Sequence, residues 1–159
     1  MKKLFMLFVA LCLTGVVKAQ FSSSSEVYVY VKTGESLSKN ISTYACYFSS
    51  GNAIVDQYSL KIFQDWYRED PTLYKKLREK GSVWEYDSEN STYKRTTYHY
   101  HIPASSFWGT AAADVYLSFS KDRESLIWWK KGSDDKTYYR RVSLSEIAPK
   151  SQNKDFLYE

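Results

Sequence analysis

Two histidines on one predicted strand are the first residues whose type and spacing could do chemistry. His99 and His101 are two positions apart in a stretch of strand periodicity, so both rings project from the same face. Two such rings can provide two metal ligands, but zinc requires a third or a fourth, and none stands nearby. Arg95 on the same face also disfavours a cation. We therefore expect hydrogen-bonded or solvated rings, with His99 and His101 only as weak metal candidates, and we expect no cofactor.

Two carboxylates on the preceding predicted strand form a second candidate. Glu85 and Asp87 share a face, an arrangement that glycosidases use for acid and base work. The stretch is similar to the Glu-x-Asp-x-x-Glu pattern of some retaining glycosidases, except that Asn90 occupies the last position. The chain is also short for such an enzyme and its cleft. We expect these acids to form a solvated face.

The common nucleophile motifs are missing from the sequence. There is no Gly-x-Ser-x-Gly elbow, no Ser-x-x-Lys with its supporting motifs, and no glycine-rich loop that leads into a helix. A small hydrolase with an unrecognised site remains the third hypothesis for function. It would require Glu85, Asp87, His99 and His101 to converge on one pocket.

Aromatic residues give the strongest indication of function, since Phe, Trp and Tyr make up 18% of the sequence. Trp128 and Trp129 are adjacent on one predicted strand, so their side chains must point to opposite faces. At most one of them can enter a single core. Tyr and Trp are enriched at surfaces that bind partners, and their rings also stack on sugars. The candidate ligand-binding residues are Trp108, Trp128, Trp129, Tyr139 and Arg140.

The elements that must position these residues are mostly strands. The stretch from Asp114 to Leu144 alternates apolar and polar positions and contains two polar turns, 121–125 and 132–135, which predicts a three-stranded meander. The same period predicts further strands at 26–32, 43–49, 53–58, 83–87 and 92–102. Residues 104–113 are expected to form a connecting loop with at most one helical turn.

Helical spacing replaces the strand period between residues 59 and 80. Leu60, Phe63 and Trp66 recur at helical intervals, and Asp70 followed by proline marks the start of a second short helix over 71–80. Gly81 is expected to close that helix in the left-handed conformation.

These elements predict an α+β fold in which a mostly antiparallel, twisted sheet carries one or two short helices on one face. An all-β sandwich or a small barrel is the alternative. One domain is expected over residues 20–159, because about 140 residues can bury one core without disulfides or metal ions. Its ends, 20–25 and 146–159, are expected to be mobile.

Residues 1–19 have the parts of a secretory signal peptide: two lysines, an apolar run from Leu4 to Val17, and Ala19 before the cut. Removing three of the 22 basic residues leaves 19 against 18 acidic ones, so the charge argument for nucleic-acid binding is lost. Cys46 then remains as a single cysteine, and its place between Tyr44 and Phe48 on one strand face indicates burial.

The sequence therefore predicts a non-enzymatic binding module of bacterial type, exported to the periplasm or outside the cell. Its expected partner is a protein or another component of the cell envelope, and the alternative is a glycan bound by exposed aromatic side chains. We expect no nucleic-acid partner and no membrane span in the mature chain. The glycan hypothesis requires Trp108, Trp128 or Trp129 to be exposed in a groove with polar neighbours such as Asp134 or Arg140.

Overall fold

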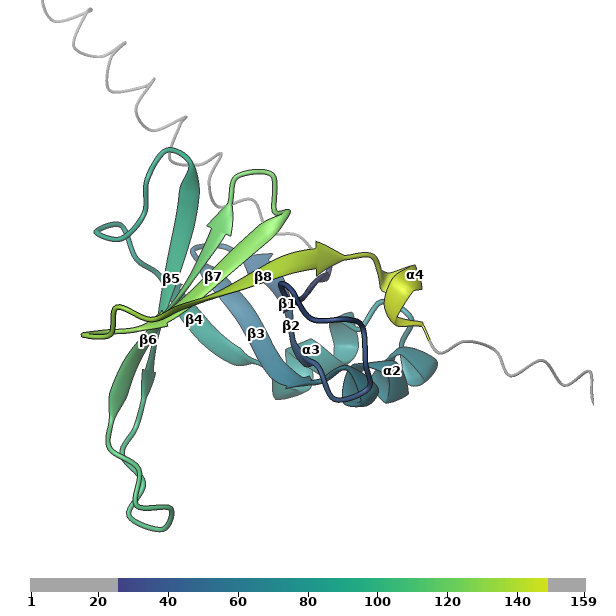
Figure 1. The fold of residues 1–159 in the computed structure, drawn as a ribbon, viewed down its shortest axis with the longest axis horizontal. Coiled ribbons are helices and arrows are strands. Elements are labelled where there is room, and N and C mark those ends of the chain that lie inside the picture. The colour runs from purple at the N-terminus through teal and green to yellow at the C-terminus, as the bar shows by residue number, and fades with distance from the viewer. Residues whose placement is uncertain (1–25, 149–159) are drawn as a thin grey trace, which may run out of the picture.

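A closed barrel of eight antiparallel strands forms the body of the protein (Figure 1). The structure is a computed structural model and describes residues 26–148. Each strand pairs with its neighbours in the sequence, and β1 pairs with β8 to close the barrel. The strands are β1 (Tyr28–Lys32), β2 (Ser42–Ser49), β3 (Asn52–Ser59), β4 (Ser82–Tyr86), β5 (Arg95–Ile102), β6 (Ala113–Ser120), β7 (Ser125–Lys130) and β8 (Lys136–Val142).

The barrel interior is filled largely with aromatic rings, because alternate residues of every strand point inward. One face of each strand thereby enters a common core that all eight strands share. The valines of β1, Val29 and Val31, point the opposite way and are also buried. The inward residues of this core are Tyr30, Tyr44, Cys46, Phe48, Ala53, Val55, Trp84, Tyr98, Val115, Leu117, Phe119, Leu126 and Tyr139.

Three helices cover the outside of the barrel beside β1, β2 and β3 (Figure 1). They are α2 (Leu60–Glu69), α3 (Tyr74–Lys80) and α4 (Leu144–Ile147). Phe63 of α2 and Leu77 of α3 are fully buried against the outer face of these strands. The apolar faces of these amphipathic helices therefore pack on the outer face of the strands and form a second apolar core outside the barrel.

The expected antiparallel sheet with helices on one side is present, and it closes into a barrel as in the alternative. Closure removes the two unpaired edges that an open sheet would leave. The strands expected at 43–49 and 53–58 and the meander from 114 to 144 are confirmed. The segment expected as a loop over 104–113 instead extends the β5–β6 hairpin, with a bridge between Ser105 and Thr110.

The second helix ends at Lys80 as predicted, but its start and the glycine that follows it differ from the prediction. It starts at Tyr74, and the Asp70 carboxylate accepts hydrogen bonds from the main-chain N–H groups of Thr72 and Lys75. Gly81 is extended, with φ −69° and ψ 148°, so the expected left-handed conformation is wrong. A Cβ at Gly81 would lie 2.6 Å from Ile54 Cγ2 and from the Leu77 carbonyl oxygen. Glycine is required there for space between α3 and β3.

The segments expected to be a signal peptide, a mobile lead at 20–25 and most of a mobile tail lie outside the described residues. Ile147, which falls in the stretch expected to be a mobile end, is fully buried in α4. Its helix begins with a capping box in which Ser143 and Glu146 exchange hydrogen bonds. Within residues 26–148, no helix is long and apolar enough to cross a membrane.

Cys46 is fully buried inside the barrel, as the strand pattern predicted. Burial raises the pKa of its thiol, so the reactive thiolate is scarce at neutral pH. We expect native Cys46 to react with a disulfide reagent such as DTNB at least ~1,000-fold more slowly than in urea, since the barrel must open first. Absorbance at fixed pH measures both rates. Comparable rates would show that the thiol is accessible in the folded protein.

Candidate binding site

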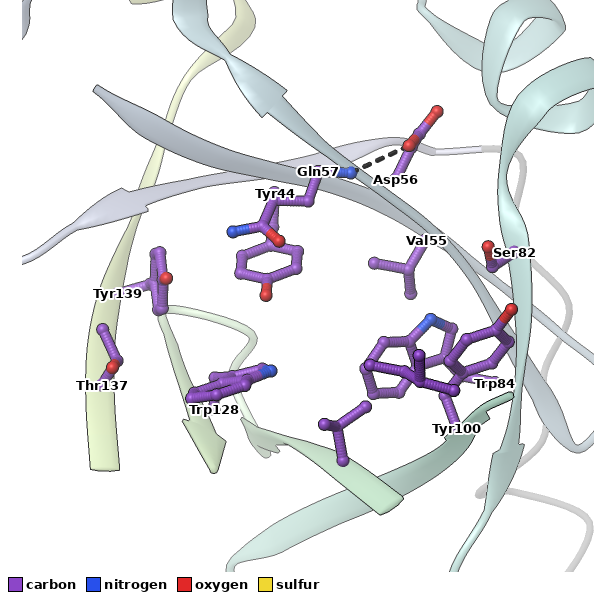
Figure 2. A pocket seen from close by; sticks show the side chains of 12 residues that line it. Tyr44, Val55, Asp56, Gln57, Ser82, Trp84, Tyr100, Trp128, Thr137 and Tyr139 are labelled. Carbon is purple, nitrogen blue, oxygen red and sulfur yellow. Dashed lines mark hydrogen bonds between the residues drawn. The ribbon is translucent and has the colours of Figure 1, made fainter. Parts of the chain in front are cut away.

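A cavity of about 360 Å³ occupies one end of the barrel interior (Figure 2). Seven of the eight strands, β2 to β8, contribute residues to its lining, and all of these except Asp56 face inward. The volume lies in the lower part of the range for small-molecule pockets, about 300–1,000 Å³. The lining residues are Tyr44, Val55, Asp56, Gln57, Ser82, Trp84, Tyr100, Ile102, Val115, Trp128, Thr137 and Tyr139.

Aromatic rings form opposite walls of this cavity. Trp84 and Tyr100 stack at 5.2 Å between ring centroids with an interplanar angle of 26°. Tyr44 and Tyr139 meet edge to face at 5.0 Å. Figure 2 shows Trp128 below Tyr44 and Tyr139, across the space from Trp84 and Tyr100, with its ring directed into that space. The two rings of each pair hold one another, so these walls are formed before a ligand enters.

Apart from the hydroxyl and N–H groups of the aromatic rings, the polar side chains that reach the cavity are an amide and two hydroxyls, none of them charged. The Gln57 amide Nε2 donates to Ser42 Oγ at 3.0 Å, which fixes that side chain at the top of the space in Figure 2. Thr137 and Ser82 add hydroxyl groups on the neighbouring walls. Asp56 lies between inward-facing Val55 and Gln57, and its carboxylate points away from the cavity.

Burial keeps the two tyrosines of the lining neutral. Desolvation raises the pKa of the Tyr44 phenol, and the nearby Tyr139 phenol raises it further. Desolvation also raises the pKa of Tyr139, against a smaller opposing effect of its hydrogen bond with Ser42. Both groups therefore act as hydroxyl donors or acceptors throughout the physiological pH range.

The opposite end of the barrel is closed by a packed aromatic layer and one arginine. Phe119 contacts Phe48, Tyr30 and Tyr98 at centroid distances of 5.1, 5.5 and 5.9 Å. The Arg123 guanidinium lies 3.7 Å from the centroid of the Phe48 ring, and the Tyr30 hydroxyl donates to the Arg123 carbonyl at 2.8 Å. We call this packed layer, formed by Phe119, Phe48, Tyr30 and Tyr98, the floor of the barrel. It closes the cavity at this end.

The open end of the cavity is the end from which the β5–β6 hairpin projects. Ile102 ends β5, Val115 follows the start of β6, and both line the cavity. The hairpin between them extends well beyond the barrel (Figure 1). Any ligand that enters from this end passes the base of the hairpin.

The structure brings together two of the five predicted binding residues. Trp128 and Tyr139 both line the cavity. Trp108 is 76% exposed in the β5–β6 connection, and Arg140 is exposed on the outer surface. Trp129 also lies outside, stacked on Tyr116 at 5.2 Å with Lys136 Nζ 5.2 Å from its ring. The predicted divergence of the two tryptophans is confirmed.

The histidine pair lies on the outer face of the barrel and shares one carboxylate. His99 Nε2 and His101 Nδ1 lie 2.8 and 3.0 Å from the same Oδ1 of Asp114. These bonds lower the pKa of the Asp114 carboxyl. Among the described residues, no group of three or more His, Cys, Asp and Glu side chains is arranged to hold a metal ion.

The acidic pair also lies outside the cavity. Glu85 is opposite His99 in the β4–β5 register and is exposed. Asp87 orders the loop that follows β4, because its carboxylate accepts from the main-chain N–H groups of Glu89 and Asn90 at 2.9 and 3.1 Å. None of the residues required by the hydrolase hypothesis lines the cavity.

Sequence reasoning missed Tyr44, Trp84 and Tyr100 as site residues. The alternation of apolar and polar residues in each strand did assign these side chains to a definite strand face, and it was the signal that could have identified them. The pattern could not show that strands distant in the sequence curve round a common space. A second depression of about 520 Å³, next to Tyr93 and Lys121, is shallow and lies on the outer surface.

Comparisons with family models, with curated proteins and with solved structures find no match to this chain.

Proposed function

We propose that this protein is an exported binding module that holds one small, uncharged, largely apolar ring molecule in the mouth of its barrel. The observation that carries the proposal is the aromatic cavity of about 360 Å³, open at one end and closed at the other. Eight-stranded barrels have an interior that side chains just fill or that accepts one small ligand. Here the packed layer around Phe119 occupies one half and the cavity the other.

The lining favours a neutral ligand. No ammonium or guanidinium group lines the cavity, and the one lining carboxylate, Asp56, points away from it. A charged ligand would lose its hydration without an opposite charge to compensate, at a cost of several kcal/mol. A flat apolar ring instead gains contact with Trp84, Tyr100 and Trp128 and releases water from all three.

A carbohydrate is the second candidate ligand. Trp128 is half-buried in a concave site and has the polar neighbours Thr137 and Gln57, in place of the expected Asp134 and Arg140. Sugar rings stack on such indole faces, but their hydroxyl groups each need a polar partner. Five aromatic side chains line the cavity against three amide or aliphatic hydroxyl side chains, so we favour an apolar ring over a sugar.

We expect Trp128→Ala to weaken binding of an uncharged aromatic fluorophore, N-phenyl-1-naphthylamine, by about tenfold or more. The substitution removes one wall of the cavity, and a tenfold loss corresponds to about 1.4 kcal/mol of binding free energy. Fluorescence titration of the mature protein measures the dissociation constant. Competition with glucose and with naphthalene then separates the two ligand classes.

Trp129→Ala is the matched control, because the neighbouring indole lies on the outer face of the same strand. We expect it to leave the dissociation constant within about twofold of the wild type, or about 0.4 kcal/mol. Equal losses in both variants would place the fluorophore outside the cavity and contradict the proposal. Displacement by glucose alone would replace the apolar ligand with a sugar.

A further inference from the structure

The β5–β6 hairpin carries the most exposed apolar group of the described chain. Phe107 is 84% exposed and Trp108 is 76% exposed, and both rings belong to the turn at the tip. Ile102 at the base is 40% exposed. From Ile102 to Ala113 the sequence contains no charged residue, although 25% of the whole chain is charged.

The two rings are held in a defined arrangement without help from the barrel. Ser105 and Thr110 exchange two main-chain hydrogen bonds of 2.9 and 3.0 Å, which clamp the turn. Gly109 takes a φ of 62°, which lets the chain reverse directly after Trp108. The Phe107 and Trp108 rings then meet edge to face at 4.9 Å. The tip is a compact aromatic wedge.

The size of this wedge limits what can cover it. Two aromatic side chains bury roughly 300–500 Å² together, whereas specific protein interfaces bury about 1,200–2,000 Å². A bilayer surface sets no such minimum, because it accepts any apolar wedge that carries no charge. Trp in particular favours the headgroup level, where its ring meets the acyl chains and its N–H meets water.

We propose that the tip of the β5–β6 hairpin, Phe107 and Trp108, inserts into the headgroup region of a lipid bilayer. The open end of the barrel then faces the lipid surface, because Ile102 and Val115 at the hairpin base also line the cavity mouth. Insertion is shallow, since the main chain of the turn must keep its contact with water. The attachment depends on apolar contact rather than on lipid charge.

Co-sedimentation with vesicles tests this attachment. The mature protein is mixed with phosphatidylcholine vesicles, with and without a quarter of phosphatidylglycerol, and the pelleted fraction is measured. We expect the wild type to pellet with both, and the double variant Phe107→Ser/Trp108→Ser to lose at least fivefold of the bound fraction. Raising the salt concentration should leave the wild-type fraction unchanged, because no charge is involved.

Tyr93→Ser is the matched control, because Tyr93 is 81% exposed in the loop at the opposite end of the barrel. It should pellet like the wild type. Three results would overturn the proposal: no pelleting of the wild type, equal pelleting of the tip variant, or binding that requires phosphatidylglycerol and disappears in salt. A dimer in light scattering that the tip variant abolishes, without vesicle binding, would identify a second copy as the occupant.

The same variants separate this proposal from the function of the cavity. Phe107 and Trp108 do not line the cavity, so the tip variant should bind N-phenyl-1-naphthylamine in solution with the wild-type dissociation constant. If the tip variant loses vesicle binding but still binds the fluorophore normally, the wedge attaches the protein to lipid and the cavity binds its ligand independently. Normal vesicle binding without fluorophore binding supports the wedge and removes the ligand hypothesis.

Discussion

Phe119→Ala is expected to lower the free energy of unfolding by about 3–5 kcal/mol. Phe119 is fully buried at the centre of the aromatic floor and contacts Tyr30, Phe48 and Tyr98. Rigid aromatic neighbours cannot collapse into the space that the ring leaves, so the cavity cost adds to the lost burial. Domains of this size are stable by only about 5–15 kcal/mol. Urea unfolding followed by circular dichroism measures the change.

Phe107→Ala makes the same chemical change on an exposed ring and serves as the control. The Phe107 side chain is 84% exposed, so its removal should alter the free energy of unfolding by less than about 0.5 kcal/mol. Similar effects of the two substitutions would contradict the arrangement in which one ring is the floor of the barrel and the other is solvent-exposed.

Thr137→Trp is expected to weaken N-phenyl-1-naphthylamine binding by at least about 100-fold, or about 2.7 kcal/mol. Thr137 is opposite Trp128 in the β7–β8 register, and its side chain faces the cavity (Figure 2). An indole at this position fills the space that the ligand would occupy. Strands accept tryptophan well, so the barrel should keep its fold. Fluorescence titration gives the affinity, and the urea midpoint reports whether the variant is folded.

Tyr138→Trp provides the corresponding control at the next residue of the same strand. Tyr138 is 55% exposed and points outward, so a larger ring there leaves the cavity unchanged. We expect wild-type affinity for the fluorophore. If a folded Thr137→Trp variant bound the fluorophore as tightly as the wild type, the cavity would not be the binding site.

The strands and their faces could be predicted from the sequence because period-2 alternation is a local property. Trp128 and Trp129 show this most clearly, since adjacency alone required opposite faces, and the structure places one inside and one outside. The same logic placed Cys46 in the interior. Each of these predictions needed only the residues next to the one in question.

Closure of the sheet could not be predicted, because it depends on the pairing of β1 with β8 across more than 100 residues. No local pattern distinguishes a twisted open sheet from one whose edges meet. For the same reason no local pattern indicated that helices α2, α3 and α4 cover the valines of β1. The cavity follows from closure, and its walls were therefore missed.

Gly81 shows a different limit of sequence reasoning. A glycine after a helix usually adopts a left-handed conformation, and that frequency supported the prediction. The structure uses the missing side chain instead, because a Cβ would collide with Ile54 of β3. The collision depends on how closely the helix approaches the barrel, which the sequence around Gly81 does not contain.

A crystal structure of the protein soaked with a brominated N-phenyl-1-naphthylamine would show whether an apolar ring binds inside the barrel. Anomalous diffraction locates the bromine without any assumption about the ligand pose. We expect one strong peak inside the barrel, between the Trp84–Tyr100 stack and Trp128. Bromine peaks only on the outer surface, or a barrel mouth filled by its own side chains, would contradict this expectation.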